Sequence, residues 1–422
     1  MLRSLFSAIS GLNAHQTKMD TVSNNIANVN TVGYKSQSTV FEDTLSQVLR
    51  NGSAPTSDTA GTNPAQVGLG VQVAGISTDW TQGSTQSTGR ASDFMISGDG
   101  FFVTQSGSQQ LYTRAGSFDL DGSNRLVTPN GALLQGWTAD ANGVVNSNGA
   151  IGDLTIPYGS SIPPVATTDG AVTGNLSSGA AVGATAVTQA TMYDQLGNAH
   201  QMTYTFTNTA PNTWSLAVQD GTTPVQVNGA ATVPVTFNNA GEMTGPTLAA
   251  VPPATTGTPG FQFTPANGAT WPGPVTVDLG GVTGYGSASA LGSARPAAGA
   301  GSAMGTLESY TLGDDGTITG VYSNGLRKAI GQVALATFTN PGGLSKSGDS
   351  SYAVGDNSGQ PQIGTAGTGG RGDLSSGALE MSNVDLSQEF TNLIIAQRGF
   401  QANSKVITTS DDILQTLVNL KS

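Results

Sequence analysis

Apolar residues recur every seven positions near both ends of this chain, and this repeat limits the possible folds more than any other feature. The N-terminal repeat comprises Leu5, Leu12, Met19 and Ile26. The C-terminal repeat comprises Leu386, Leu393, Phe400, Ile407 and Leu414. A seven-residue step places its members on one side of a helix. The repeats therefore predict helices over residues 2–28 and 386–420.

Polar residues interrupt a second set of positions on the C-terminal helix. This set begins at Phe390 and continues, in steps of seven, through Gln397, Ser404 and Asp411 to Val418. A seam that is half polar makes a weak isolated coiled coil. We therefore expect the two terminal helices to pack together and to need further neighbours before they are fully ordered. A helix pair confined to one chain is the alternative.

The composition argues against several classes of function. The net charge is −12, which disfavours binding to nucleic acid or anionic lipid. The chain has no cysteine and only two histidines, His15 and His200, so little is available for a nucleophilic or metal site. No run of apolar residues is long enough to span a membrane, and the N-terminal stretch lacks the continuous apolar centre of a secretory signal. We expect no enzyme, no cofactor and no membrane insertion.

The middle of the chain predicts β structure. Short alternating apolar runs are separated by turn dipeptides such as Asp99-Gly100, Asp121-Gly122 and Asn130-Gly131. The runs lie at residues 71–76, 94–96, 101–103, 111–113, 118–120, 126–127, 202–206, 214–218, 233–237, 275–279, 307–322, 330–338 and 352–354. The predicted fold class is mainly β, with two nested all-β domains, one inserted in the other. The paired N- and C-terminal α-helices would form a coiled-coil-like inner domain.

Shifts in composition predict the domain boundaries. Glycine, serine, threonine and proline are enriched between the periodic segments, where they favour linkers and turns. We expect a terminal helical core of residues 1–35 and 378–422, extended connectors over 36–70 and 359–377, an inner β domain of 71–150 and 300–358, and an inserted outer β domain of 151–299. A short helical patch is expected at residues 41–49 in the first connector.

Runs at both ends carry a resemblance to a known family. Residues 23–35 read SNNIANVNTVGYK, residues 379–386 read LEMSNVDL, and Gln397-Arg398 follows. The chain resembles the bacterial flagellar axial proteins, which comprise rod, hook and hook-associated subunits, and among them it looks most like the hook proteins. Residues 94–103 and 112–118 resemble the first β domain of hook and distal rod proteins. Residues 193–198 resemble the outer domain of hook proteins.

The resemblance implies a structural subunit that self-assembles into the flagellar hook, a flexible joint that transmits torque from the rod to the filament. It implies export to the cell exterior without a cleaved signal peptide. The implied partners are further copies in a helical tube, the distal rod protein, the hook cap protein, the hook–filament junction protein and the flagellar export apparatus. A distal rod subunit that forms a stiff tube is one alternative. An exported β-rich adhesin or carbohydrate-binding module is another.

The resemblance also implies positions for subunit packing. They are the residues of both helical repeats with Phe390, and the residues that follow the first helix: Asn24, Asn25, Asn28, Gly33 and Tyr34. Asparagines at the end of a helix are also ordinary capping residues, which is the simpler interpretation.

Overall fold

The computed structural model describes residues 2–52, 54–55, 60–246, 260–263, 271–294 and 299–419. The chain divides into two compact units. Unit 1 comprises Met1–Ile156, Tyr310–Gly320 and Lys328–Ser422. Unit 2 comprises Pro157–Ser309 and Val321–Arg327. Each unit therefore contains segments that are far apart in the sequence.

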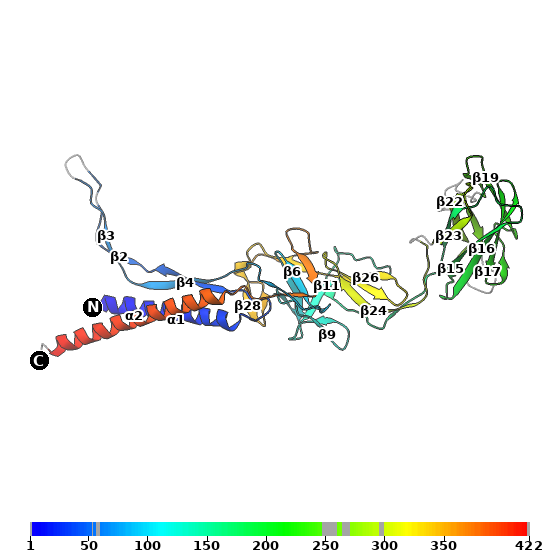
Figure 1. Cartoon of the computed structure of the whole chain (residues 1–422). Helices are drawn as coiled ribbons and strands as arrows, with labels where there is room; N and C mark the ends of the chain where they lie inside the picture. The colour runs from blue at the N-terminus through cyan, green and yellow to red at the C-terminus, as the bar shows by residue number, and fades with distance from the viewer. Residues whose placement is uncertain are drawn as a thin grey trace. The chain divides into compact units, whose positions relative to one another are not determined.

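Two helices at the two ends of the chain pack against each other in unit 1. Helix α1 spans Leu2–Ala27 and helix α2 spans Leu386–Asn419, and they run side by side in opposite directions (Figure 1). Asp385 is the N-cap of α2: its carboxylate accepts hydrogen bonds from the backbone N–H groups of Ser387 and Gln388. The predicted pairing of the terminal helices is confirmed. Residue 420, the last of the predicted second helix, lies outside the described residues.

A two-stranded ribbon follows α1. Strand β1 (Gln37–Asp43) pairs antiparallel with β4 (Val71–Thr78), and β2 (Ser46–Arg50) pairs antiparallel with β3 (Ala65–Gly68). Strands β1 and β4 contact α1, where the ring of Phe41 lies edge-on to the imidazole of His15 with the ring centroids 5.7 Å apart. The helix expected at residues 41–49 is wrong, because these residues lie mainly in strands β1 and β2. Pairing with β4 and β3 supplies backbone hydrogen bonds that so short a helix forms poorly. Strand β4, expected in the inner β domain, instead belongs to this ribbon.

The β sheet of unit 1 joins strands from before and after the excursion into unit 2. Along the sheet the order is β26, β11, β7, β8, β29 and β28. The bounds are β7 Phe101–Ser106, β8 Gln109–Thr113, β11 Leu133–Thr138, β26 Arg327–Val333, β28 Ser345–Gly348 and β29 Ser351–Ala353. Phe101, Tyr112, Trp137, Phe338 and Tyr352 form much of its core. This arrangement confirms the nested fold class.

Short strands complete the β structure of unit 1. They are β5 Thr85–Ser87, β6 Phe94–Ser97, β9 Asp119–Leu120, β10 Leu126–Val127, β12 Gly152–Asp153, β27 Leu335–Thr337, β30 Gln362–Gly364, β31 Asp373–Ser376 and β32 Ala378–Glu380, with a 3-10 turn at Pro341–Gly343. Strand β30 pairs with β27, and β31 pairs with β6. The segment expected as a second connector therefore contributes two strands to the β structure.

Two sheets with a shared core form most of unit 2. One has the order β21, β22, β14, β23, and the other has the order β15, β16, β17, β19, β20 with β18 beside β17. The bounds are β14 Asp169–Asn175, β15 Thr185–Tyr193, β16 Ala199–Ala210, β17 Thr213–Asp220, β18 Thr223–Val225, β19 Val233–Phe237, β20 Met243–Gly245, β21 Gly260–Phe263, β22 Val275–Thr283 and β23 Ala290–Ala294. Alternate residues of β16 and β17 are buried, as expected where one face of a sheet covers a core. Of the remaining strands, β13 (Ser161–Ile162) lies in unit 2, β24 (Gly305–Leu312) contains residues of both units, and most of β25 (Thr317–Tyr322) lies in unit 1.

The buried tyrosines make stability sensitive to alkaline pH. The ordinary pKa of a tyrosine is 10.0. Burial raises the pKa of Tyr112 to about 12. Burial is also the main reason that the pKa of Tyr352 is raised to about 12. Ionisation is therefore easier in the unfolded chain than in the folded one. Stability from these tyrosines is fully present below pH 10 and is lost as the pH rises towards about 12.

We predict that Tyr112→Phe makes the loss of unfolding free energy between pH 10 and about 12 shallower than in the wild type. Urea unfolding at successive pH values, followed by circular dichroism, measures this slope. Tyr285→Phe, at an exposed position, is the control and should keep the wild-type slope. The same slope in all three proteins would contradict the prediction.

Candidate subunit interface

Small residues make the contact between α1 and α2. Ala8 and Ala14 of α1 and Ala396 of α2 are buried. A Cβ atom added to Gly399 would lie 2.5 Å from Cε1 of His15, and one added to Gly11 would lie 2.8 Å from Nδ2 of Asn403. The two helices therefore approach closely along a stripe of alanine and glycine. The spacing of Ala8, Gly11 and Ala14 by threes was a sequence signal for this stripe, but the larger apolar residues of the repeat obscured it.

The large apolar residues of the repeats lie beside this stripe. Leu5, Leu12, Met19, Ile26, Leu393, Phe400, Ile407 and Leu414 are half-buried, whereas Leu386 and Phe390 are exposed. Further apolar side chains extend into solvent from both helices: Phe6, Ile9, Ile394, Ile395, Val406 and Ile413. Ile394 is 57% exposed and Phe6 is 64% exposed. A helix pair with apolar side chains on its outside presents a surface suited to another protein.

The residues after α1 form a compact hydrogen-bonded turn. Asn25 is fully buried; its Nδ2 donates to the carbonyl of Gln37 at 2.7 Å, and its Oδ1 accepts from the Tyr34 hydroxyl at 3.1 Å. The Tyr34 hydroxyl in turn accepts from Nδ2 of Asn24, and Asn28 donates to the Asn24 carbonyl. Gly33 has φ +67°, and a Cβ atom there would lie 2.5 Å from the backbone nitrogen of Ala115. These contacts give the turn residues partners within the chain, and their role between subunits stays a prediction.

A buried ion cluster joins the segment after α1 and the segment before α2 to the β structure. Nζ of Lys35 lies 2.6 Å from Oε1 of Glu380, and Nη1 of Arg114 lies 3.3 Å from Oε2 of the same carboxylate. The three side chains are at most 3% exposed. Nζ of Lys35 also donates to the carbonyl of Thr81, and Oε1 of Glu380 accepts from the backbone N–H of Gly83. Burial lowers the pKa of Lys35, and this effect outweighs the opposing effect of the Glu380 carboxylate.

Asn383 extends this cluster, and together they form what we call the terminal junction: Lys35, Arg114, Glu380 and Asn383. Oδ1 of Asn383 accepts from the backbone N–H of Ser36 at 2.8 Å, and its Nδ2 donates to the carbonyl of Asp79 at 2.9 Å. The backbone carbonyl of Glu380 accepts from the N–H of Gly33 at 2.8 Å. The junction thus ties the N-terminal and C-terminal segments to each other. Sequence reasoning used Lys35 and Glu380 only as parts of family-like runs and missed their pairing.

The two histidines occupy structural positions. His15 of α1 packs against Gly399 of α2. Its pKa is lowered, mainly because the imidazole is partly buried. In unit 2, Nδ1 of His200 lies 2.8 Å from Oδ2 of Asp220, and its Nε2 lies 3.5 Å from Oδ2 of Asp194. Asp194 also accepts hydrogen bonds from the backbone N–H groups of Leu196 and Asn198. His200 therefore links the turn after β15 to the end of β17.

Among the described residues, no helix is both long and apolar enough to cross a membrane.

We predict that Glu380→Gln lowers the free energy of unfolding by about 3–5 kcal/mol, because two buried cations then lose their carboxylate. Asp119→Asn is the matched control, since it removes the carboxylate of the exposed pair with Arg90. The control should cost about 1 kcal/mol or less. Urea denaturation measures both. Similar losses in the two variants would show that the buried cations do not depend on the Glu380 carboxylate.

Models of flagellar protein families match most of the chain. The model described as "Flagella basal body rod protein" matches residues 5–35, and "Flagellar hook protein FlgE/F/G D1 domain" matches residues 95–174. "Flagellar basal body protein FlaE D2 domain" matches residues 168–296, and "Flagellar basal body rod FlgEFG protein C-terminal" matches residues 375–420. The matches include most of both terminal helices and parts of both units.

Relatives match along the full length. The flagellar hook protein FlgE of Borreliella burgdorferi is 40% identical over 469 residues, with 100% of each chain covered. The flagellar hook protein FlgE of Treponema pallidum is 40% identical over 466 residues with the same coverage. The flagellar basal-body rod protein FlgG of Bacillus subtilis is 32% identical over 422 residues, again with 100% of each chain covered. The resemblance seen in the terminal runs is confirmed, and the chain belongs to the FlgE/F/G family of flagellar hook and basal-body rod proteins.

Proposed function

We propose that this chain is the subunit of a flagellar hook and that it self-assembles into a tube. The observation that carries the proposal is the outer surface of the α1–α2 pair, where Phe6, Phe390 and Ile394 are at least half exposed. A single copy leaves these side chains in water, and neighbouring copies can cover them. Contacts between different surfaces of successive copies generate an open helical assembly.

The proposed tube has an inner layer and an outer layer. The helical core of residues 1–35 and 378–422 forms the inner layer and carries most of the apolar contact, including the residues of both repeats. The inner β domain (71–150 and 300–358) and the inserted outer β domain (151–299) lie outside it and contact neighbours through polar surfaces. Such contacts exchange partners at low cost, which suits a joint that bends while it rotates.

The subunit acts mechanically and catalyses no reaction. We place it in the extracellular hook, between the distal rod protein and the hook–filament junction protein. The hook cap protein and the flagellar export apparatus are its partners during assembly. Greater identity to the two hook relatives than to the rod relative supports the hook over the rod. A distal rod subunit, which forms a straight and stiff tube, is the second candidate because the rod relative also matches over its full length.

We predict that Ile394→Ser leaves the monomer's free energy of unfolding within about 0.5 kcal/mol of the wild type but prevents tube formation. The physical reason is that Ile394 is 57% exposed in the single chain and is covered only by a neighbouring copy. Gln397→Ser, at an exposed polar position on the same helix, is the control and should still form tubes. Sedimentation measures the polymerised fraction, and electron microscopy shows its form.

The form of the wild-type polymer distinguishes the candidates. Curved tubes support the hook subunit, and straight tubes favour the rod subunit. Monomers at high concentration would count against both and favour an adhesin or binding module. Normal tubes from Ile394→Ser would contradict the role assigned to the exposed helix face.

A further inference from the structure

A tight turn in unit 2 joins Val227 to Ala230 through Asn228 and Gly229. The N–H of Val227 donates to the carbonyl of Ala230 at 2.8 Å, and the N–H of Ala230 donates to the carbonyl of Val227 at 2.9 Å. Both central residues have positive φ, +49° at Asn228 and +79° at Gly229, as in a type I′ turn. Asn228 and Gly229 are exposed, whereas Val227 is buried in the core of unit 2. This Asn-Gly pair is therefore open to water on an anchored turn.

An Asn-Gly pair can lose the asparagine amide without an enzyme. The backbone nitrogen of the glycine gives up its proton to solvent and forms a bond to Cγ of the asparagine; glycine has no side chain to crowd this attack. Negative charge collects on Oδ1, and the bond from Cγ to Nδ2 then breaks, which releases ammonia and leaves a cyclic succinimide. Water opens this ring to aspartate or isoaspartate. The whole reaction consumes one water molecule and replaces an amide by a carboxylate.

The glycine nitrogen of this turn differs from that of most other Asn-Gly pairs. In four other pairs the glycine N–H donates to a carbonyl three residues earlier. These pairs are Asn130-Gly131, Asn142-Gly143, Asn148-Gly149 and Asn324-Gly325. The N–H of Gly229 has no hydrogen-bond partner among the described residues. Its nitrogen therefore gives up no hydrogen bond when it attacks the asparagine side chain.

The side-chain carbonyl of Asn228 is held by strand β21. Its Oδ1 accepts from the backbone N–H of Gln262 at 2.9 Å, and the N–H of Asn228 donates to the carbonyl of Gln262 at 2.9 Å. A backbone N–H at this distance stabilises the negative charge that develops on the oxygen. Oδ1 of Asn324 likewise accepts from the N–H of Leu326 at 3.1 Å, but the glycine after Asn324 has its nitrogen engaged. Among the Asn-Gly pairs that the structure describes, Asn228-Gly229 alone combines a held oxygen with an unengaged glycine nitrogen.

We propose that Asn228 is a site of spontaneous deamidation, at which the folded chain and water convert this asparagine to aspartate and isoaspartate. The product adds a negative charge to the exposed turn. Isoaspartate also places an extra carbon atom in the backbone, which lengthens the path between Val227 and Ala230 and disturbs their pairing. Because Val227 also forms a β-bridge with Phe263, the change loosens the turn from β21.

The first test compares Asn-Gly pairs within one protein. Full-length protein is incubated in mildly alkaline buffer made with ¹⁸O-water, folded in one sample and unfolded in concentrated urea in the other. Mass spectrometry of its peptides gives the deamidation rate at each pair, and ¹⁸O marks events that occurred during the incubation. In urea we expect similar rates, whereas in the folded chain Asn228 should react at least about fivefold faster than Asn324. A folded-state rate at Asn228 no higher than that at Asn324 would overturn the inference.

The second test uses a matched pair of variants, Asn228→Gln and Asn324→Gln. Glutamine keeps the amide but closes the corresponding ring far more slowly. Isoaspartate is measured by enzymatic methyl transfer to folded protein that has been incubated as above. We expect Asn228→Gln to lower the isoaspartate content clearly and Asn324→Gln to leave it near the wild-type level. Equal reductions in the two variants, or no reduction in Asn228→Gln, would overturn the assignment of the site.

Discussion

The buried carboxylate of Glu380 is the interaction on which the arrangement of unit 1 depends. It binds Lys35 from the N-terminal segment, Arg114 from the β structure and the backbone of Gly83. These groups are distant in the sequence. Because they meet in one cluster, the segment after α1 and the segment before α2 are held against the same part of the β structure. A buried ion cluster is a weak source of net stability but requires a specific geometry, since any misplacement leaves a charge unpaired. The junction thus specifies orientation more than it adds stability.

The helix pair beyond the junction packs closely on its inner side and leaves apolar side chains exposed on its outer side. Alanine and glycine let α1 and α2 approach, so the larger apolar side chains are displaced to the flanks instead of being enclosed. This division explains how one chain pairs its own ends and still leaves apolar surface exposed. It also explains why a seven-residue repeat that resembles a coiled coil is only half-buried in the single chain. Membership of a flagellar hook and rod family is consistent with such a surface.

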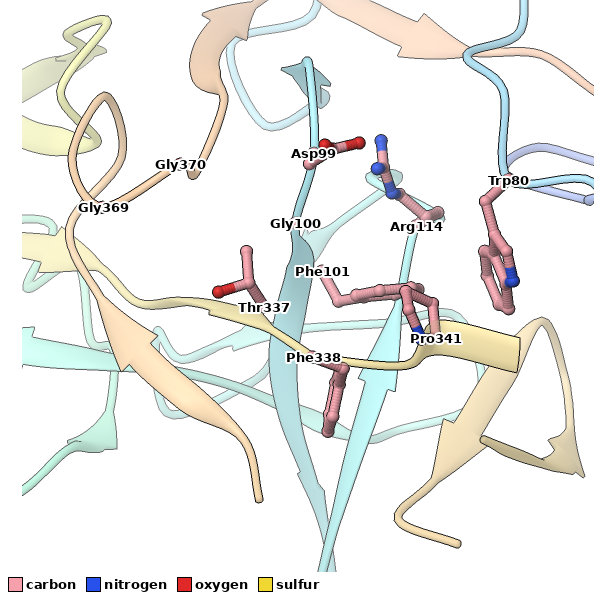
Figure 2. Close-up of a pocket in the computed structure, with 10 residues that line it drawn as sticks. All are labelled: Trp80, Asp99, Gly100, Phe101, Arg114, Thr337, Phe338, Pro341, Gly369 and Gly370. Atoms are coloured by element: carbon pink, nitrogen blue, oxygen red, sulfur yellow. The ribbon is translucent and has the colours of Figure 1, made fainter. Parts of the chain in front are cut away.

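The β structure of unit 1 closes around the excursion into unit 2. Strands β7, β8 and β11 come before the excursion, and β26, β27 and β29 come after it, yet they share one sheet and one core of aromatic rings. Two of these rings, Phe101 and Phe338, also line a pocket beside Arg114 (Figure 2). The aromatic core and the ion cluster of the terminal junction therefore meet at Arg114.

Much of the fold could be predicted from local pattern. The seven-residue repeats indicated both helices and their pairing, and alternation with Gly-containing turns indicated most strands, because these signals act over a few residues. Residues 41–49 were misassigned because their strand form depends on partners beyond residue 60. The pairing of Glu380 with Lys35 and with Arg114 was equally hidden. It depends on contacts across hundreds of residues, and only the tertiary structure decides which charged groups share a buried site.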